Sequence, residues 1–263
     1  MQLTFPHRET WLHQVNPTLK IVLFSLWFLA VILIHNFNVM LNVAIGSLLL
    51  LPWSGHPWKR LLLYATPFLL VFVSTSTGMM FFGKGETDWF RWGLVNITEE
   101  SFYRGLHLGF RALSMAAVGL LFGLTTRPVR LFYSLMQQGR LAPKYAYSFL
   151  AALRLVPIII DEFQTLRHAL KIRGMRKRGW FIGFYQLVHR YAIPLLAQSI
   201  RRAHRIAVAM EAKGFAGRAK RTYYYSIGFS YRDIVFVTYT LAVFGVAFLA
   251  GTYWPYLDII DVR

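Results

Sequence analysis

The stretch ALKIRGM, residues 169–175, is echoed forty positions later by AMEAKGF, residues 209–215. Each copy begins with a small residue and places a cation immediately before a glycine. Glycine takes the left-handed conformation without penalty, so it commonly ends a helix. The echo therefore predicts two long helices with matched cationic ends. Such a pair suits docking to a soluble partner that has two lobes.

The sequence around the echo predicts helices rather than strands. Apolar residues recur at helical spacing ahead of the second copy, and a proline precedes each copy, Pro157 and Pro194. We expect helices near 128–138, 144–174, 180–188 and 190–214. This block, residues 126–232, carries 20 of the 29 lysines and arginines but only three acids.

The rest of the chain has the composition of a membrane protein. Of the 263 residues, 56% are hydrophobic and 15% are charged, where soluble domains have about a quarter charged. A membrane span needs about 20 mostly apolar residues. Five candidate spans meet or approach this: Leu19–His35, Asn38–Trp53, Leu61–Gly83, Phe102–Thr125 and Asp233–Thr252. The predicted fold is therefore an all-α polytopic membrane protein with about five transmembrane helices and a helical coupling module on the cytoplasmic side.

The charge pattern predicts the orientation and the domains. Basic loops stay in the cytoplasm, so residues 126–232 are expected there, with the N-terminus inside and the C-terminus outside. We expect transmembrane helices 1–4 in 1–125, the coupling module in 126–232, and helix 5 with the tail in 233–263. The net charge of +18 then indicates anionic lipid headgroups rather than nucleic acid, and the same holds for the basic run at 174–178.

Several kinds of chemistry find no support in the sequence. The chain has no cysteine, and its eight histidines show no metal-ligand spacing. It has no phosphate-binding loop of the Gly-x-x-x-x-Gly-Lys-Ser/Thr type. We expect no catalytic residues, no cofactor and no metal.

The cations Arg173 and Lys213 have two possible roles. A cation near a helix C-terminus can simply complement the helix dipole, for about 0.3–1 kcal/mol. Two cations in matched contexts favour docking instead, because the small residues around them let a partner approach closely. The candidate docking residues from this pattern are Ala169, Arg173, Gly174, Ala209, Ala212, Lys213 and Gly214.

Two further groups of ionisable residues are candidates for structural roles. Arg154 and Asp161 share a helix face at a spacing of seven, with Glu162 adjacent, and we expect intramolecular pairing that fixes the long helices. Arg104, His107 and Arg111 share a face of the fourth span. We expect these three to reach the outer interface or to pair with the neighbouring glutamates.

These segments resemble the transmembrane T component of energy-coupling-factor (ECF) transporters, a family of vitamin and metal importers. The resemblance is carried by Asn16-Pro17-Thr18 with Lys20, by Thr125-Thr126-Arg127-Pro128, by Tyr147–Gly174 and by Ile193–Phe215. Together with the order of spans, it covers nearly the whole chain.

The resemblance implies a scaffold subunit without an active site. Its partners would be two ATP-binding-cassette ATPase subunits and a small membrane-embedded substrate-binding subunit, in a bacterial or archaeal cell membrane. In that family an Ala-Arg-Gly-like tripeptide ends each of two coupling helices. The matching positions here are Ile172-Arg173-Gly174 and Ala212-Lys213-Gly214, so Ile172 replaces a small residue and Lys213 replaces an arginine. Lysine keeps the charge but loses the planar fork that makes bidentate contacts.

Two other functions compete with the scaffold. An ordinary ABC importer permease would line its own substrate path and carry one coupling helix per chain. A membrane-embedded enzyme would carry clustered His, Asp or Glu within its spans. The cargo stays open among vitamins, vitamin precursors and metal ions.

Overall fold

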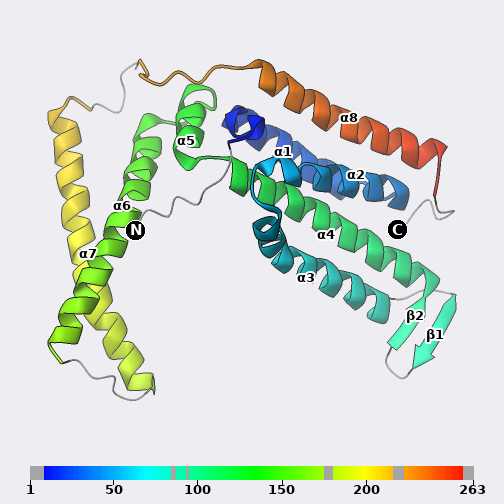
Figure 1. Ribbon diagram of the computed structural model, residues 1–263, viewed down its shortest axis with the longest axis horizontal. Helices are drawn as coiled ribbons and strands as arrows, with labels where there is room; N and C mark the ends of the chain where they lie inside the picture. Colours follow the sequence, from blue (N-terminus) through cyan, green and yellow to red (C-terminus); the bar gives the residue numbers. More distant parts are fainter. Residues whose placement is uncertain (1–8, 84–86, 93–94, 175–179, 216–221, 257–263) are drawn as a thin grey trace. The chain divides into compact units, whose positions relative to one another are not determined.

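The computed structural model describes residues 9–83, 87–92, 95–174, 180–215 and 222–256 (Figure 1). Its five apolar helices are α1 (Pro17–Leu33), α2 (Phe37–Leu49), α3 (Trp58–Phe82), α4 (Glu99–Thr125) and α8 (Tyr231–Tyr253). Four apolar stretches are long enough to cross a membrane, α2 doing so together with the 3-10 helix Leu51–Ser54, and α1 is shorter. The predicted nearly all-α fold is confirmed, and the five predicted spans correspond to these five helices.

Side-chain caps mark the beginnings of these helices, as their sequences predict. The Asn36 side chain accepts a hydrogen bond from the Asn38 amide (2.9 Å) at the start of α2. The Thr98 hydroxyl accepts one from the Ser101 amide (3.2 Å) at the start of α4. Each cap satisfies an amide that has no partner within its helix.

The apolar helices share a core that lies mainly between α1, α2, α4 and α8. Trp27 of α1 is buried there, stacks edge-to-face on Phe244 of α8 and donates to the Ser114 hydroxyl of α4 (3.2 Å). Glycines allow close packing elsewhere. A Cβ at Gly105 would lie 2.6 Å from the Ser76 carbonyl oxygen, so α3 and α4 approach closely there. Outside this core, α3 and α8 expose large apolar side chains, which is the arrangement expected against lipid.

The extracellular-side candidate loop at 84–100 contains a feature that the sequence analysis missed. Strands β1 (Asp88–Trp92) and β2 (Val95–Thr98) pair antiparallel, in the order β1-β2. The signal was present, since both runs are rich in aromatic and β-branched residues.

The chain divides into two compact units. Unit 1 comprises Met1–Ser134 and Ile227–Arg263, and unit 2 comprises Leu135–Ser226. These boundaries fall within α5 (Pro128–Gln137) and shortly before α8. The assignment of membrane and coupling roles to particular residue ranges stays a prediction.

Unit 2 is built around two long helices, α6 (Pro143–Ile172) and α7 (Trp180–Ala212). They run antiparallel and cross, as Figure 1 shows. Near one end Tyr147 packs edge-to-face on Phe215, and nearer the other end Phe163 packs on Tyr191.

The prediction of two separate helices at 180–188 and 190–214 was wrong, because α7 runs through both ranges as one helix. The polar residues His189 and Arg190 interrupt the apolar pattern without interrupting the helix. Pro194 also lies inside α7, so it removes one backbone hydrogen bond but does not end the helix.

Candidate functional site

The C-terminal end of α6 presents the first docking cation. Arg173 is the residue that caps the helix, and its amide donates to the Ala169 carbonyl (3.1 Å). The Gly174 amide donates to the Lys171 carbonyl (3.1 Å), and Gly174 has a φ of 70°. This left-handed turn is the one that glycine adopts most readily, so the sequence places the end of the helix directly after the cation.

The C-terminal end of α7 has the same geometry. The Lys213 amide donates to Ala209 (3.2 Å), the Gly214 amide donates to Glu211 (2.9 Å), and Gly214 has a φ of 77°. The Phe215 amide closes back onto the Met210 carbonyl (2.9 Å). These two reversed bonds form a Schellman motif, so the residues of the sequence echo have equivalent backbone positions at the two helix ends.

All eight predicted docking residues are exposed, namely Ala169, Ile172, Arg173, Gly174, Ala209, Ala212, Lys213 and Gly214. Ile172 is 87% exposed, which is unusual for a large apolar side chain in a helix end. Within the described residues, the side chains of Arg173 and Lys213 make no hydrogen bond or ion pair, since the two caps are completed by backbone groups alone. Both cations are therefore available to a partner.

The structure does not bring the two cationic ends together. Because α6 and α7 are antiparallel, Gly214 lies near the beginning of α6, beside Tyr147, while Gly174 lies at its far end. At about 1.5 Å per residue, the helix between Tyr147 and Arg173 rises roughly 40 Å. The two ends are thus separate contact points that a single small partner domain cannot cover.

Glu162 joins the two helices, whereas Arg154 and Asp161 do not pair with each other. The Glu162 carboxylate forms an ion pair with Arg202 of α7 and accepts a hydrogen bond from the Gln198 amide group (2.9 Å). Both Arg154 and Asp161 are exposed on α6. Arg202 and Gln198 were not singled out in the sequence, because a contact between helices is not visible in the spacing along either one.

Exposed apolar side chains form a second feature of unit 2 that the sequence analysis did not single out as a surface. On α6 they recur at spacings of three and four and comprise Phe149, Leu153, Val156, Ile160 and Phe163. On α7 the exposed set comprises Ile193, Leu196, Ile200 and Val208. We call these residues the apolar stripes of the hairpin. The helical periodicity of the sequence was their signal.

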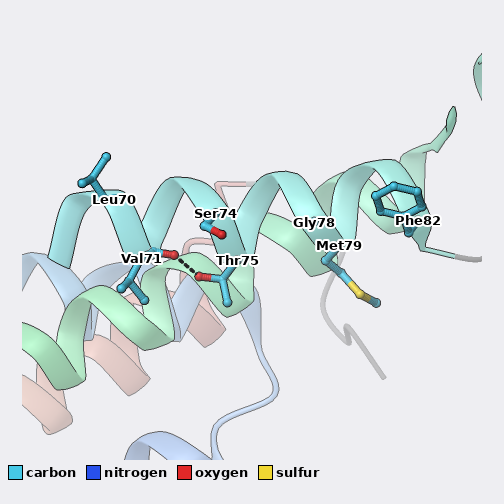
Figure 2. Close-up of a pocket in the computed structure, with 7 residues that line it drawn as sticks. All are labelled: Leu70, Val71, Ser74, Thr75, Gly78, Met79 and Phe82. Atoms are coloured by element: carbon cyan, nitrogen blue, oxygen red, sulfur yellow. Dashed lines mark hydrogen bonds between the residues drawn. The ribbon is translucent and has the colours of Figure 1, made fainter. Parts of the chain in front are cut away.

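Unit 1 carries a shallow groove of about 620 Å³ along α3, away from any predicted site residue (Figure 2). It is lined by Leu70, Val71, Ser74, Thr75, Gly78, Met79 and Phe82. The Thr75 hydroxyl donates to the carbonyl of Val71 in its own helix, as the dashed line in Figure 2 marks. With no charged lining residue, the groove is suited to an apolar surface and not to a charged substrate.

The expectation for Arg111 was wrong. Its Nη2 donates to the Ile34 carbonyl (2.6 Å), just beyond the end of α1, instead of reaching a glutamate or the interface. His107, one turn earlier, is buried. An arginine at this place satisfies a carbonyl that α1 leaves without a helical partner. The remainder of the basic run at 174–178 lies outside the described residues.

Comparisons with known proteins agree with this geometry. Residues 8–224 match the model of the CbiQ family, described as cobalt transport protein. The chain is 26% identical over 249 residues to the energy-coupling factor transporter transmembrane protein EcfT of Lacticaseibacillus paracasei, covering 92% of this chain and 94% of the relative. It is 28% identical over 252 residues to EcfT of Limosilactobacillus fermentum, covering 91% and 92%.

The match spans the apolar helices of the first 125 residues and both cationic helix ends. With its apolar helices, the chain is a multi-pass membrane protein. It belongs to the CbiQ family of transport proteins.

Proposed function

We propose that this chain is the transmembrane scaffold subunit of an ECF-type importer. It binds two ATP-binding-cassette ATPase subunits through the ends of α6 and α7 and a small membrane-embedded substrate-binding subunit through other surfaces. The observation that carries the proposal is the pair of matched, exposed cationic ends at opposite ends of one helical hairpin. Two such points fit two ATPase subunits, one at each end.

In this arrangement the chain transmits motion and has no active site of its own. When the ATPase pair closes on ATP and reopens, the subunits carry the two hairpin ends with them. Glu162 and Arg202 hold α6 against α7, so a displacement at one end is passed along the hairpin. The substrate-binding subunit responds by reorienting in the membrane and releasing its cargo inside.

The apolar stripes of the hairpin support the second part of the proposal. Large exposed apolar sets on a non-spanning unit indicate a covered surface in the assembly. The membrane-embedded substrate-binding subunit is the partner whose surface is itself apolar. Its cargo would be a vitamin, a vitamin precursor or a metal ion.

The placement in the cell follows from the basic residues. A bacterial or archaeal cell membrane is proposed, with the basic residues 126–232 and the N-terminus in the cytoplasm and the C-terminus outside. Lysines and arginines near the membrane surface would contact anionic lipid headgroups. The alternative of an ordinary ABC permease is disfavoured because the α3 groove offers no charged lining residue. The two coupling ends also exceed the one that such a permease would carry.

The test is co-purification of the partners with docking variants. Removing one member of a buried charged contact costs about 2–5 kcal/mol. In a single Arg173→Ala or Lys213→Ala variant the second docking point still holds the complex through effective concentration. We expect most ATPase to be recovered with either single variant and little with the double variant, while the substrate-binding subunit is retained. Full ATPase recovery with the double variant would mean that the cations only cap their helices.

A further inference from the structure

A buried polar network links three distant parts of unit 1 around Asn16. The Ser134 hydroxyl of α5 donates to Asn16 Oδ1 (2.8 Å) and shares a hydrogen bond with the Thr18 hydroxyl (2.6 Å). Asp233 of α8 accepts from the Asn16 amide through Oδ1 (2.7 Å). The Asn16 side-chain amide donates to the Gly228 carbonyl (3.5 Å). Asn16, Ser134 and Asp233 are each at most 3% exposed.

Further contacts connect the same N-terminal segment to the chain between α4 and α5. Lys20 is 1% exposed and its ammonium donates to the Thr125 hydroxyl (3.0 Å) and carbonyl (3.3 Å). Arg130 donates to the His13 carbonyl (3.2 Å). Arg127 forms an ion pair with Glu9. Residues 9–20, which we call the N-terminal clasp, therefore hold segment 125–134 at several points.

The clasp lies where the chain crosses between the two units. The chain leaves unit 1 after Ser134 and returns to it at Ile227. Asn16 bonds Ser134 on the outgoing segment and Gly228 on the returning one. Within unit 2, Gln137 donates to the Tyr225 carbonyl (2.6 Å), which joins the same two segments a few residues further on. The two crossings therefore run together, tied once in each unit.

The network has the cost of a specialised site. Burying charged groups such as Lys20 and Asp233 is unfavourable unless each is paired or hydrogen-bonded. An apolar contact would pack segments 9–20, 125–134 and 228–233 with less desolvation. Directional hydrogen bonds do what apolar contacts do not, since they fix the relative positions of two backbone segments.

We propose that the N-terminal clasp is a positioning element that makes the two crossings one stiff joint. Motion of the coupling helices is then passed to α1 and α8 and is not absorbed in loose connecting segments. Asn16 is its central residue, because its side chain and backbone contact both crossings and the start of α8. The inference rests on the proposed function, since it assumes that ATP-driven motion enters through unit 2.

The experiment uses the complex of the full chain with its two ATPases and substrate-binding subunit. Hydrogen exchange is measured in α1 and α8 without nucleotide and with ATP plus vanadate. The variants are Asn16→Ala, Ser134→Ala and the double variant. The control is Asn36→Ala, which removes the same kind of helix cap from α2 but touches neither crossing.

We expect the nucleotide-dependent change in exchange in α1 and α8 to fall about threefold or more with Asn16→Ala. Ser134→Ala removes a single hydroxyl and should act in the same direction even if Asn16→Ala assembles poorly. The double variant should be no worse than Asn16→Ala, because contacting residues are not additive. Asn36→Ala should behave as the parent chain.

An unchanged nucleotide response in an assembled Ser134→Ala or Asn16→Ala complex would overturn the inference. So would an equal loss with Asn36→Ala, which would show that any lost cap weakens the response. Failure of the parent chain to recover ATPases would instead refute the proposed function, so the two failures are distinguishable.

Discussion

At the residue scale, the two docking points share a backbone geometry but differ in their side chains. Arg173 and Lys213 occupy the same cap position, one residue before a left-handed glycine. Arginine offers a planar fork that can bind a carboxylate through two hydrogen bonds, whereas lysine acts as a point charge. The two ends should therefore bind their ATPase subunits with unequal strength.

Lys213→Arg is expected to leave ATPase recovery unchanged or to improve it. A second charge-assisted hydrogen bond adds about 1 kcal/mol, or roughly a fivefold gain in affinity. Arg173→Lys should lower affinity by a similar factor. The measurement is titration of solubilised chain with purified ATPase subunits. Weaker binding by Lys213→Arg would show that the groove facing Lys213 is shaped for an ammonium.

Glu162→Gln is expected to loosen the hairpin. It leaves Arg202 without its carboxylate while the arginine side chain is 24% exposed, at a cost of about 1–2 kcal/mol. The chain has no cysteine, so cysteines placed at Phe163 and Tyr191 report the α6–α7 contact through their rate of disulfide formation. We expect slower crosslinking with Glu162→Gln.

Asp161→Asn is the matched control for this prediction. Asp161 is the neighbouring acid, is exposed and makes no ion pair among the described residues. Equal crosslinking in the Glu162→Gln variant and the control would argue that the ion pair contributes nothing to the hairpin.

At the element scale, glycine determines where the two long helices end. Both α6 and α7 stop within two residues of a left-handed glycine, although both tolerate an internal proline. A Cβ added at Gly174 or Gly214 would meet nothing within 4 Å. The glycines are therefore needed for their backbone conformation and not for space.

Gly214→Ala is expected to disturb the end of α7 and lower ATPase recovery. A left-handed backbone costs a residue with a Cβ about 1–2 kcal/mol. Gly214→Asn should cost less, because asparagine tolerates this conformation better. The measurement is ATPase co-purification, with Gly123→Ala as control, since Gly123 has open space around it and lies in the regular helix α4. Recovery equal to the control would show that the turn is dispensable.

At the scale of the whole molecule, an apolar helical unit and a basic, surface-exposed helical hairpin are connected twice. Unit 1 exposes apolar side chains on α3 and α8, as a lipid-facing unit does. Unit 2 contributes the long amphipathic helices and most of the predicted contact residues. The division of labour that we propose follows from this contrast.

The proposed orientation predicts which positions a membrane-impermeant thiol reagent reaches in intact cells. Single cysteines at Thr87 and Tyr256 should be labelled, because both lie on the proposed outer side and are exposed. Cysteines at Lys59 and Lys144 should be labelled only after the membrane is opened. Labelling of Lys144→Cys in intact cells would reverse the orientation.

The sequence by itself determined the elements and the family. Apolar runs about as long as a bilayer is thick predicted the spans, because no water is present there to satisfy exposed backbone groups. Gly174 and Gly214 predicted the two helix ends, because their conformation is a local property of the residue. The β-hairpin at 88–98 was equally local and was overlooked.

Only the tertiary structure decided which residues meet. The sequence proposed Arg154 with Asp161 and Arg111 with a glutamate, whereas the structure pairs Glu162 with Arg202 and Arg111 with the Ile34 carbonyl. Spacing along one helix determines a shared face but not the neighbour that this face contacts. The antiparallel hairpin, which separates Arg173 from Lys213, and the clasp between residues distant in sequence depend in the same way on packing between elements.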